Sequence, residues 1–150
     1  MIGPGTGIAP FMAFLQERVG LTVVNKTEAP TKNVFYFGCR HRDVDFLYRE
    51  ELQNMEREGK LTLRVAFSRE QREKIYVQHL ILQDASFLWG LIQEGAHIYV
   101  CGDAKHMAKD VHTALLTIFQ QQGGLTADVA DKLMASLEGG HRYQRDVWVT

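Results

Sequence analysis

The chain has 150 residues, with 17 lysines and arginines against 18 aspartates and glutamates, and 45% of the residues are hydrophobic. This length suits one domain with its own core. The near balance of charge differs from the strongly basic surfaces that bind nucleic acid or anionic lipid, so we expect this domain to contact neither nucleic acid nor a membrane. No apolar run approaches the roughly 20 residues that span a bilayer.

The chain opens with a glycine-rich turn. Met1 and Ile2 are typical of the end of a buried strand, and Gly3, Gly5 and Gly7 follow at alternate positions before a helix predicted from Pro10 to Arg18. The free N–H groups and the dipole at such a helix start favour an anion such as a pyrophosphate. Because Ile8 stands where the dinucleotide fingerprint has its third glycine, a plain structural turn remains an alternative.

Strand-like and helical stretches then alternate along the chain. After a polar loop over 20–33, the pattern predicts these elements: strand Val34–Phe37, helix Asp45–Arg57, strand Leu61–Phe67, a helical stretch Val77–Gly95 broken near Asp84, strand His97–Cys101, helix Ala104–Gln122, a helix capped by Thr126 with the apolar stripe Val129, Leu133 and Leu137, and a short strand Arg145–Trp148. This order predicts an α/β fold of the Rossmann-like type, a doubly wound, mostly parallel five-stranded sheet with helices on both faces. Its first strand is truncated, which suggests a fragment of a longer protein.

Polar residues follow the strand that ends at Phe67. Ser68 and Arg69 come directly after it, and Lys74, Tyr76 and Gln78 follow at alternate positions. An NAD site usually places an acid near such a strand end, whereas hydroxyl and cationic groups suit the 2′-phosphate of NADP(H). A solvated basic loop is the alternative that these residues leave open.

The last third of the chain holds further candidates with two interpretations each. Cys101 either fills space in the core or takes part in chemistry, and His97 lies about 13 Å away along the same strand, too far to act as its base in a cysteine hydrolase. Asp103 and Asp110 can cap a helix or meet ribose hydroxyls. Trp148 can anchor the tail or cover a flat ligand. The histidines and cysteines show no metal-ligand spacing, so we expect no metal site.

Five motifs occur in order: GPGTGIAPF, YFGCR, AFSREQ-x-x-K-x-YVQH, HIYVCGDA-x-x-MAKDV and RYQRDVW. Together they resemble the NADPH-binding domain of the diflavin reductases, which are ferredoxin–NADP reductase-like. Within that family the chain most resembles the NADPH–cytochrome P450 reductases. It is also similar to sulfite reductase flavoproteins, methionine synthase reductases and the reductase half of nitric oxide synthases.

The resemblance implies a role for individual residues. Those that match the contacts to the 2′-phosphate and adenosine are Ser68, Arg69, Lys74 and Tyr76, and Gln78 belongs to the same motif. In the glycine turn, Thr6 matches a pyrophosphate contact, with Gly5 beside it and the charge of Arg40 nearby. Those that match positions beside the nicotinamide mononucleotide half are Asp103, Met107 and Asp110.

Three more residues match the site of hydride transfer. Cys101 and Asp146 match the pair that positions the nicotinamide, and Trp148 matches the aromatic that stacks on the flavin. Val149 and Thr150 extend past this tryptophan, where several relatives stop.

The resemblance also implies the reaction and the partners. NADPH would pass a hydride to FAD, and electrons would then move through FMN to a haem protein such as cytochrome P450. Residues 1–150 would form the NADP(H)-binding domain at the C-terminal end of a larger chain that supplies the FAD- and FMN-binding domains, and this fragment alone would be inactive. We expect a cytosol-facing location, with the full-length protein anchored to the endoplasmic reticulum membrane.

Overall fold

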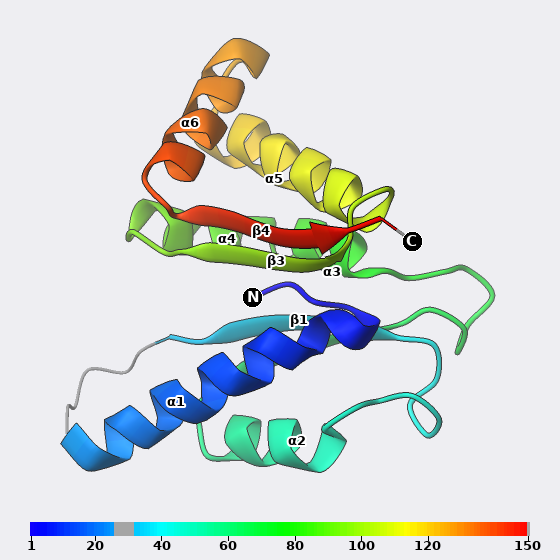
Figure 1. The fold of residues 1–150 in the computed structure, drawn as a ribbon. Helices are drawn as coiled ribbons and strands as arrows, with labels where there is room; N and C mark the ends of the chain where they lie inside the picture. The colour runs from blue at the N-terminus through cyan, green and yellow to red at the C-terminus, as the bar shows by residue number, and fades with distance from the viewer. Residues whose placement is uncertain (26–31, 150) are drawn as a thin grey trace.

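The computed structural model describes residues 1–25 and 32–149. A 3₁₀ turn, η1 (Gly5–Ile8), leads into the first helix, and the elements that follow alternate as expected (Figure 1). The helices are α1 (Ala9–Asn25), α2 (Arg49–Arg57), α3 (Val77–Gln83), α4 (Ala85–Gln93), α5 (Met107–Gly123) and α6 (Ala127–Gly139). The strands are β1 (Val34–Cys39), β2 (Thr62–Phe67), β3 (Ile98–Asp103) and β4 (Tyr143–Trp148).

The predicted mixed α/β architecture with parallel strands is confirmed. The predicted continuous five-stranded sheet is not observed. The strands form two two-stranded sheets, β1 with β2 and β3 with β4, and both pairs are parallel. Ile2 lies between the pairs and makes an isolated parallel bridge to Tyr36 on one side and to Val100 on the other. The two pairs are not joined into one sheet because the segment between them pairs through Ile2 alone.

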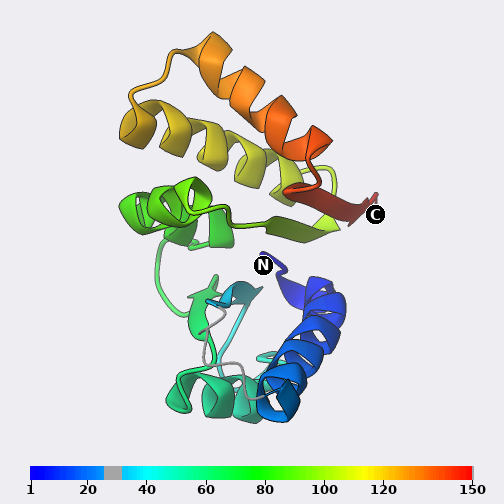
Figure 2. The same ribbon diagram turned by 90° about the vertical axis from the view of Figure 1, so that its left-hand side faces the viewer.

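Helices cover both faces of the strands. Along β1, Phe35 and Phe37 are fully buried on the face that α1 and α2 cover, where they join Phe11 and Leu52. Tyr36, one residue out of phase, is buried on the other face with residues of α3, α4, α5 and α6. This alternation is the period-2 geometry of a strand with both faces buried. Figure 2 shows α1 on one side of the strands and α3 and α4 on the other.

Several element boundaries differ from the prediction. The first helix continues through Asn25, so the predicted loop over 20–33 is wrong for 20–25, and positions 26–31 lie outside the described residues. Helix α2 begins at Arg49 rather than Asp45, because the Asp45 carboxylate accepts hydrogen bonds from the loop backbone and Tyr48 adopts a left-handed φ of 54°. Strand β4 begins at Tyr143 rather than Arg145.

Other predictions are confirmed. The stretch after Val77 forms two helices that meet at Asp84. Helix α5 ends at Gly123, one residue past its predicted end, and Gly124 follows with a left-handed φ of 63°. The Thr126 hydroxyl accepts a hydrogen bond from Val129 N at 3.4 Å and caps α6. The stripe predicted for α6 is partly wrong, since Val129 is 44% exposed, whereas its neighbour Ala130 is fully buried with Leu137.

Candidate functional site

The carboxyl ends of strands β1 to β4 lie at one edge of the molecule, because both strand pairs are parallel and Ile2 makes parallel bridges to β1 and to β3. Ligands of doubly wound folds bind at this edge. A groove of about 880 Å³ is found here, within the roughly 300–1,000 Å³ that is common for small-molecule sites. Residues of the loops that follow β1, β2 and β3, of the glycine turn and of the start of α5 line this groove.

Nine of the fourteen predicted site residues line this groove: Gly5, Arg40, Ser68, Arg69, Tyr76, Gln78, Asp103, Met107 and Asp110. The other five lie outside its lining. Thr6 and Lys74 are exposed beside lining residues in the glycine turn and in the loop after β2. Cys101 is buried in β3, and Asp146 and Trp148 lie on β4.

The glycine turn is held against β3 by a close backbone approach. A Cβ on Gly7 would lie 2.2 Å from Cys101 O, so only glycine fits there. Gly5 has a φ of 57°, and a Cβ on it would meet no atom within 4 Å, which shows that this backbone faces the open groove. The turn then leads into η1 and α1, whose dipole directs partial positive charge toward the same space.

The loops after β1 and β2 are joined side by side through their backbones. Ser68 N donates to Cys39 O at 2.9 Å, and Arg69 N donates to Arg40 O at 3.1 Å. The Gln71 amide closes the second loop by donating to Phe67 O at 2.6 Å and to Glu73 O at 2.8 Å. A hydroxyl and two guanidinium groups are therefore brought to one end of the groove.

The loop after β1 also contains a residue that the sequence prediction missed. The Asp45 carboxylate accepts hydrogen bonds from Arg40 N at 3.0 Å and from His41 N at 2.8 Å. The bond from His41 in particular holds the pKa of the Asp45 carboxyl below its ordinary value. An aspartate six residues after a strand end is the pattern that could have indicated it, since Asp commonly orders a turn by accepting hydrogen bonds from nearby backbone N–H groups.

At the start of α5, Asp103 acts as a cap, one of the two roles that the sequence left open. Its carboxylate accepts hydrogen bonds from Lys105 N at 3.2 Å, His106 N at 2.8 Å and Met107 N at 3.3 Å. These bonds, that of His106 first, lower the pKa of the Asp103 carboxyl. Nearby, Gln78 Nε2 donates to Asp110 Oδ2 at 3.2 Å and links α3 to α5 across the groove wall.

Cys101 and Asp146 are opposite each other in the β3–β4 register, and Asp103 is opposite Trp148. By strand alternation Asp146 and Trp148 point to the same face as Cys101. Burial and, to a lesser degree, the charge of Asp146 raise the pKa of the Cys101 thiol. A buried thiol that stays protonated is a poor nucleophile, which gives the hydrolase alternative no support.

The lining groups follow the order of the strands. Ser68 and Arg69 come after β2, Arg40 after β1 and Gly5 after the segment at Ile2, and Asp103 is the last residue of β3. Cationic and hydroxyl groups at one end, a glycine turn in the middle and a capped helix start at the other end fit an elongated, multiply phosphorylated dinucleotide. Within 1–25 and 32–149, no group of three His, Cys, Asp or Glu side chains is placed to hold a metal ion.

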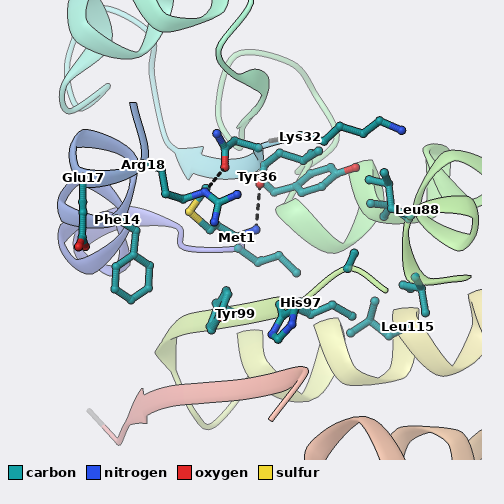
Figure 3. A pocket seen from close by; sticks show the side chains of 17 residues that line it. Met1, Phe14, Glu17, Arg18, Lys32, Tyr36, Leu88, His97, Tyr99 and Leu115 are labelled. Atoms are coloured by element: carbon teal, nitrogen blue, oxygen red, sulfur yellow. Dashed lines mark hydrogen bonds between the residues drawn. The ribbon is translucent and has the colours of Figure 1, made fainter. Parts of the chain in front are cut away.

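A second hollow, of about 600 Å³, lies at the amino ends of β1 and β3 (Figure 3). Met1, Phe14, Leu88 and Tyr99 are among the side chains around it. Beside this hollow, the Met1 amine donates a hydrogen bond to Val34 O at 2.9 Å. Burial lowers the pKa of this amine to about 5. The hollow contains none of the predicted site residues and lies at the opposite edge from the groove.

None of the helices described, over 1–25 and 32–149, has the length and apolar character needed to cross a membrane.

Residues 1–113 match the family model described as oxidoreductase NAD-binding domain. The chain is 52% identical over 149 residues to the sulfite reductase [NADPH] flavoprotein alpha-component of Photobacterium profundum. The aligned region is 99% of this chain and 24% of that protein. It is 50% identical to the human NADPH–cytochrome P450 reductase and 48% identical to that of Musca domestica, and covers 22% of each.

These identities are too similar to favour one type of relative over the other. The chain spans about a quarter of the length of the curated relatives that it matches. Over that span the family match agrees with the glycine turn, the parallel strands and the groove at their carboxyl ends. The chain belongs to the oxidoreductase NAD-binding domain family, and over almost its whole length it is similar to part of a sulfite reductase [NADPH] flavoprotein and of NADPH–cytochrome P450 reductases.

Proposed function

We propose that residues 1–150 form the NADP(H)-binding domain of a diflavin reductase, and that the groove at the carboxyl ends of the strands holds the dinucleotide. The observation that carries this proposal is the position of Ser68 and Arg69. Both line the groove directly after β2 and are hydrogen-bonded through their backbones to the loop that carries Arg40. In this proposal they bind the 2′-phosphate with Lys74, while Tyr76 and Gln78 contact the adenosine.

The remaining site residues then follow the dinucleotide across the strand ends. Gly5 and Thr6 approach the pyrophosphate, and Asp103, Met107 and Asp110 lie beside the nicotinamide mononucleotide half. Cys101 and Asp146 position the nicotinamide ring for hydride transfer to FAD. Trp148, which is 39% exposed, covers the flavin until the nicotinamide displaces it.

In the whole protein, the same chain would supply the FAD- and FMN-binding domains, with this domain at its C-terminal end. Electrons would pass from FAD through FMN to a haem protein such as cytochrome P450. The sulfite reductase flavoprotein relatives support a second acceptor system equally well. Two free cysteines, both buried, agree with a cytosol-facing domain, and a P450 reductase type would be anchored to the endoplasmic reticulum membrane by another part of the chain.

We also propose that, in the intact protein, the strands form one doubly wound sheet in the order β2, β1, the segment at Ile2, β3, β4. This segment already hydrogen-bonds on both sides. Tyr36 N donates to Met1 O at 2.9 Å, and Gly3 N donates to Tyr36 O at 3.0 Å. On the other side, Ile2 N donates to Tyr99 O at 2.8 Å, and Cys101 N donates to Ile2 O at 3.0 Å.

Calorimetric titration with NADP⁺ and NAD⁺ tests the nucleotide proposal. The unaltered chain should bind NADP⁺ more tightly than NAD⁺. Arg69→Ala should weaken the binding of NADP⁺ roughly tenfold to a hundredfold, since hydrogen bonds to charged groups contribute about 1.5–3 kcal/mol. Affinity for NAD⁺ should change little. Arg72→Ala removes the same charge from the same loop outside the groove lining, and serves as the matched control. Equal affinity of the unaltered chain for both nucleotides would contradict the proposal.

The isolated chain is expected to bind nucleotide without turnover, because its proposed electron acceptor, FAD, belongs to another domain. Purified chain should therefore lack the visible absorption bands of flavin and should not oxidise NADPH. Retention of flavin by the isolated chain would show that it carries more of the catalytic unit than we propose.

A further inference from the structure

Tyr76 and His79 are joined by a reciprocal pair of hydrogen bonds at the start of α3. The Tyr76 N–H donates to His79 Nδ1 at 2.8 Å, and the His79 N–H donates to Tyr76 O at 3.0 Å. The two rings also stack, with their centroids 5.9 Å apart and their planes at 24°. His79 therefore contacts both the backbone and the ring of Tyr76.

This arrangement fixes an aromatic ring on the groove wall. Tyr76 lines the groove and is 42% exposed, and its backbone is extended (φ −118°, ψ 170°) immediately before the helix. An exposed tyrosine without such contacts would sample several rotamers, and a ligand would have to order it on binding. A ring that is already ordered avoids this entropic cost.

The same helix start orients a second groove residue. Gln78 lies between Tyr76 and His79 in the first turn, and its side chain reaches Asp110 on α5. A helix start that frays would displace both Tyr76 and Gln78. To accept the Tyr76 N–H, Nδ1 must carry no proton, so the neutral imidazole with hydrogen on Nε2 is the competent form.

We propose that His79 is a positioning residue for nucleotide binding: its Nδ1 and ring hold Tyr76 in the orientation that receives the adenine. This inference rests on the proposed NADP(H) site. His79 acts through Tyr76 and does not line the groove itself. Because both 2′,5′-ADP and 5′-ADP contain adenine, loss of His79 should weaken the binding of both by a similar factor. Loss of Arg69, in contrast, should weaken mainly the binding of the 2′-phosphorylated nucleotide.

Three substitutions separate the contacts. His79→Asn keeps an acceptor near the position of Nδ1 without the ring, His79→Phe keeps the ring without the acceptor, and His79→Ala removes both. We expect His79→Phe and His79→Ala to weaken both nucleotides roughly three- to tenfold, the range of one neutral hydrogen bond. His79→Asn should stay within about twofold of the unaltered chain, which a general loss of packing would not allow.

His97→Ala provides the matched control. His97 also stacks on a tyrosine, Tyr99, with centroids 6.3 Å apart, but in the hollow at the opposite edge. It should leave nucleotide affinity unchanged. Hydrogen exchange of the Tyr76 amide gives a readout that needs no nucleotide, since protection should persist in His79→Asn and be lost in His79→Phe and His79→Ala.

The outcomes separate this inference from the function on which it rests. If the unaltered chain binds both nucleotides and the three variants bind equally well, the inference fails and the proposed function stands. The inference also fails if His79→Phe behaves like the unaltered chain and His79→Asn like His79→Ala, because the acceptor would then have no role. If the unaltered chain binds neither nucleotide, both proposals fail, even where the Tyr76 amide is protected.

Discussion

Cys101 on β3 and Asp146 on β4 are direct partners in the register of two parallel strands, 45 positions apart in the sequence. The thiol is only 3% exposed, whereas the carboxylate belongs to an exposed residue of the neighbouring strand. Register partners in a parallel pair point to the same face, so the negative charge lies beside the thiol and disfavours its ionisation. The pair is therefore suited to orienting a ligand rather than to nucleophilic attack.

This relationship predicts slow alkylation of the folded chain. Burial is the main cause that raises the pKa of the Cys39 thiol to about 11, and burial also raises that of Cys101. At about pH 8 iodoacetamide should modify Cys39 roughly a hundredfold more slowly than in urea, since the thiolate fraction falls tenfold per unit. Mass spectrometry after timed quenching would measure both sites.

Asp146→Asn sharpens this test. Removal of the charge should speed alkylation of Cys101 roughly two- to fivefold, the range of an exposed charge interaction, while Cys39 serves as an internal control. Rapid, stoichiometric labelling of Cys101 in the unaltered folded chain would contradict both its burial and its protonated state.

Gly7→Ala should destabilise the chain. The new Cβ would lie 2.2 Å from Cys101 O and 2.9 Å from Cys101 C, and these backbone atoms cannot move aside without distortion of β3. The free energy of unfolding in urea should fall by about 1–3 kcal/mol or more. Gly139→Ala is the control, because a Cβ there meets no atom within 4 Å and alanine suits the end of α6. If both substitutions had the same small effect, the close approach of the glycine turn to β3 would be refuted.

Gln71→Ala should weaken binding of 2′-phosphorylated nucleotides without unfolding the chain. The Gln71 amide joins Phe67 O to Glu73 O, and these carbonyls flank the segment that carries Ser68 and Arg69. Loss of two neutral hydrogen bonds should lower affinity for 2′,5′-ADP roughly three- to thirtyfold through disorder of this loop. Calorimetry and the melting temperature would be measured together.

The control for this prediction is Gln121→Ala, an exposed glutamine on α5 outside the groove lining. It should leave the affinity unchanged. A drop in melting temperature that accounts for all the lost binding would assign Gln71 a structural role only.

Trp148→Ala should shift cofactor preference in a full-length diflavin reductase that carries this domain. Trp148 is exposed on β4 beside Asp103, and in our proposal it competes with the nicotinamide for the flavin face. Aromatic pairs contribute about 0.5–1.5 kcal/mol beyond area burial, so the ratio of kcat/KM for NADH over NADPH should rise roughly two- to tenfold. Turnover with NADPH should fall where product release becomes limiting.

Steady-state kinetics with both nucleotides would check this, with Trp148→Phe as an intermediate that keeps a smaller stacking ring. An unchanged ratio in Trp148→Ala would leave the tryptophan as an anchor of β4 alone.

The sequence predicted the elements with the strongest local signals. A short run of apolar residues, Val34–Phe37, predicted a strand where β1 lies, and the break at Asp84 and the cap at Thr126 were found at their predicted places. One helix boundary was wrong because a side chain binds the nearby loop backbone instead of starting the helix. Residues from Asp45 onward have a helical pattern, but the Asp45 carboxylate binds the preceding loop instead and delays the helix to Arg49.

The sequence by itself determined the residue types of the site and their order at the strand ends, because turn glycines, strand periodicity and the polar residues that follow each strand are local properties. Only the tertiary structure decided which of them meet. The pairing of Cys101 with Asp146 and the joining of the Ser68 and Arg40 loops depend on strand register and on backbone hydrogen bonds between segments that lie far apart in the sequence. These are set by how the whole core packs, so residue spacing alone does not specify them.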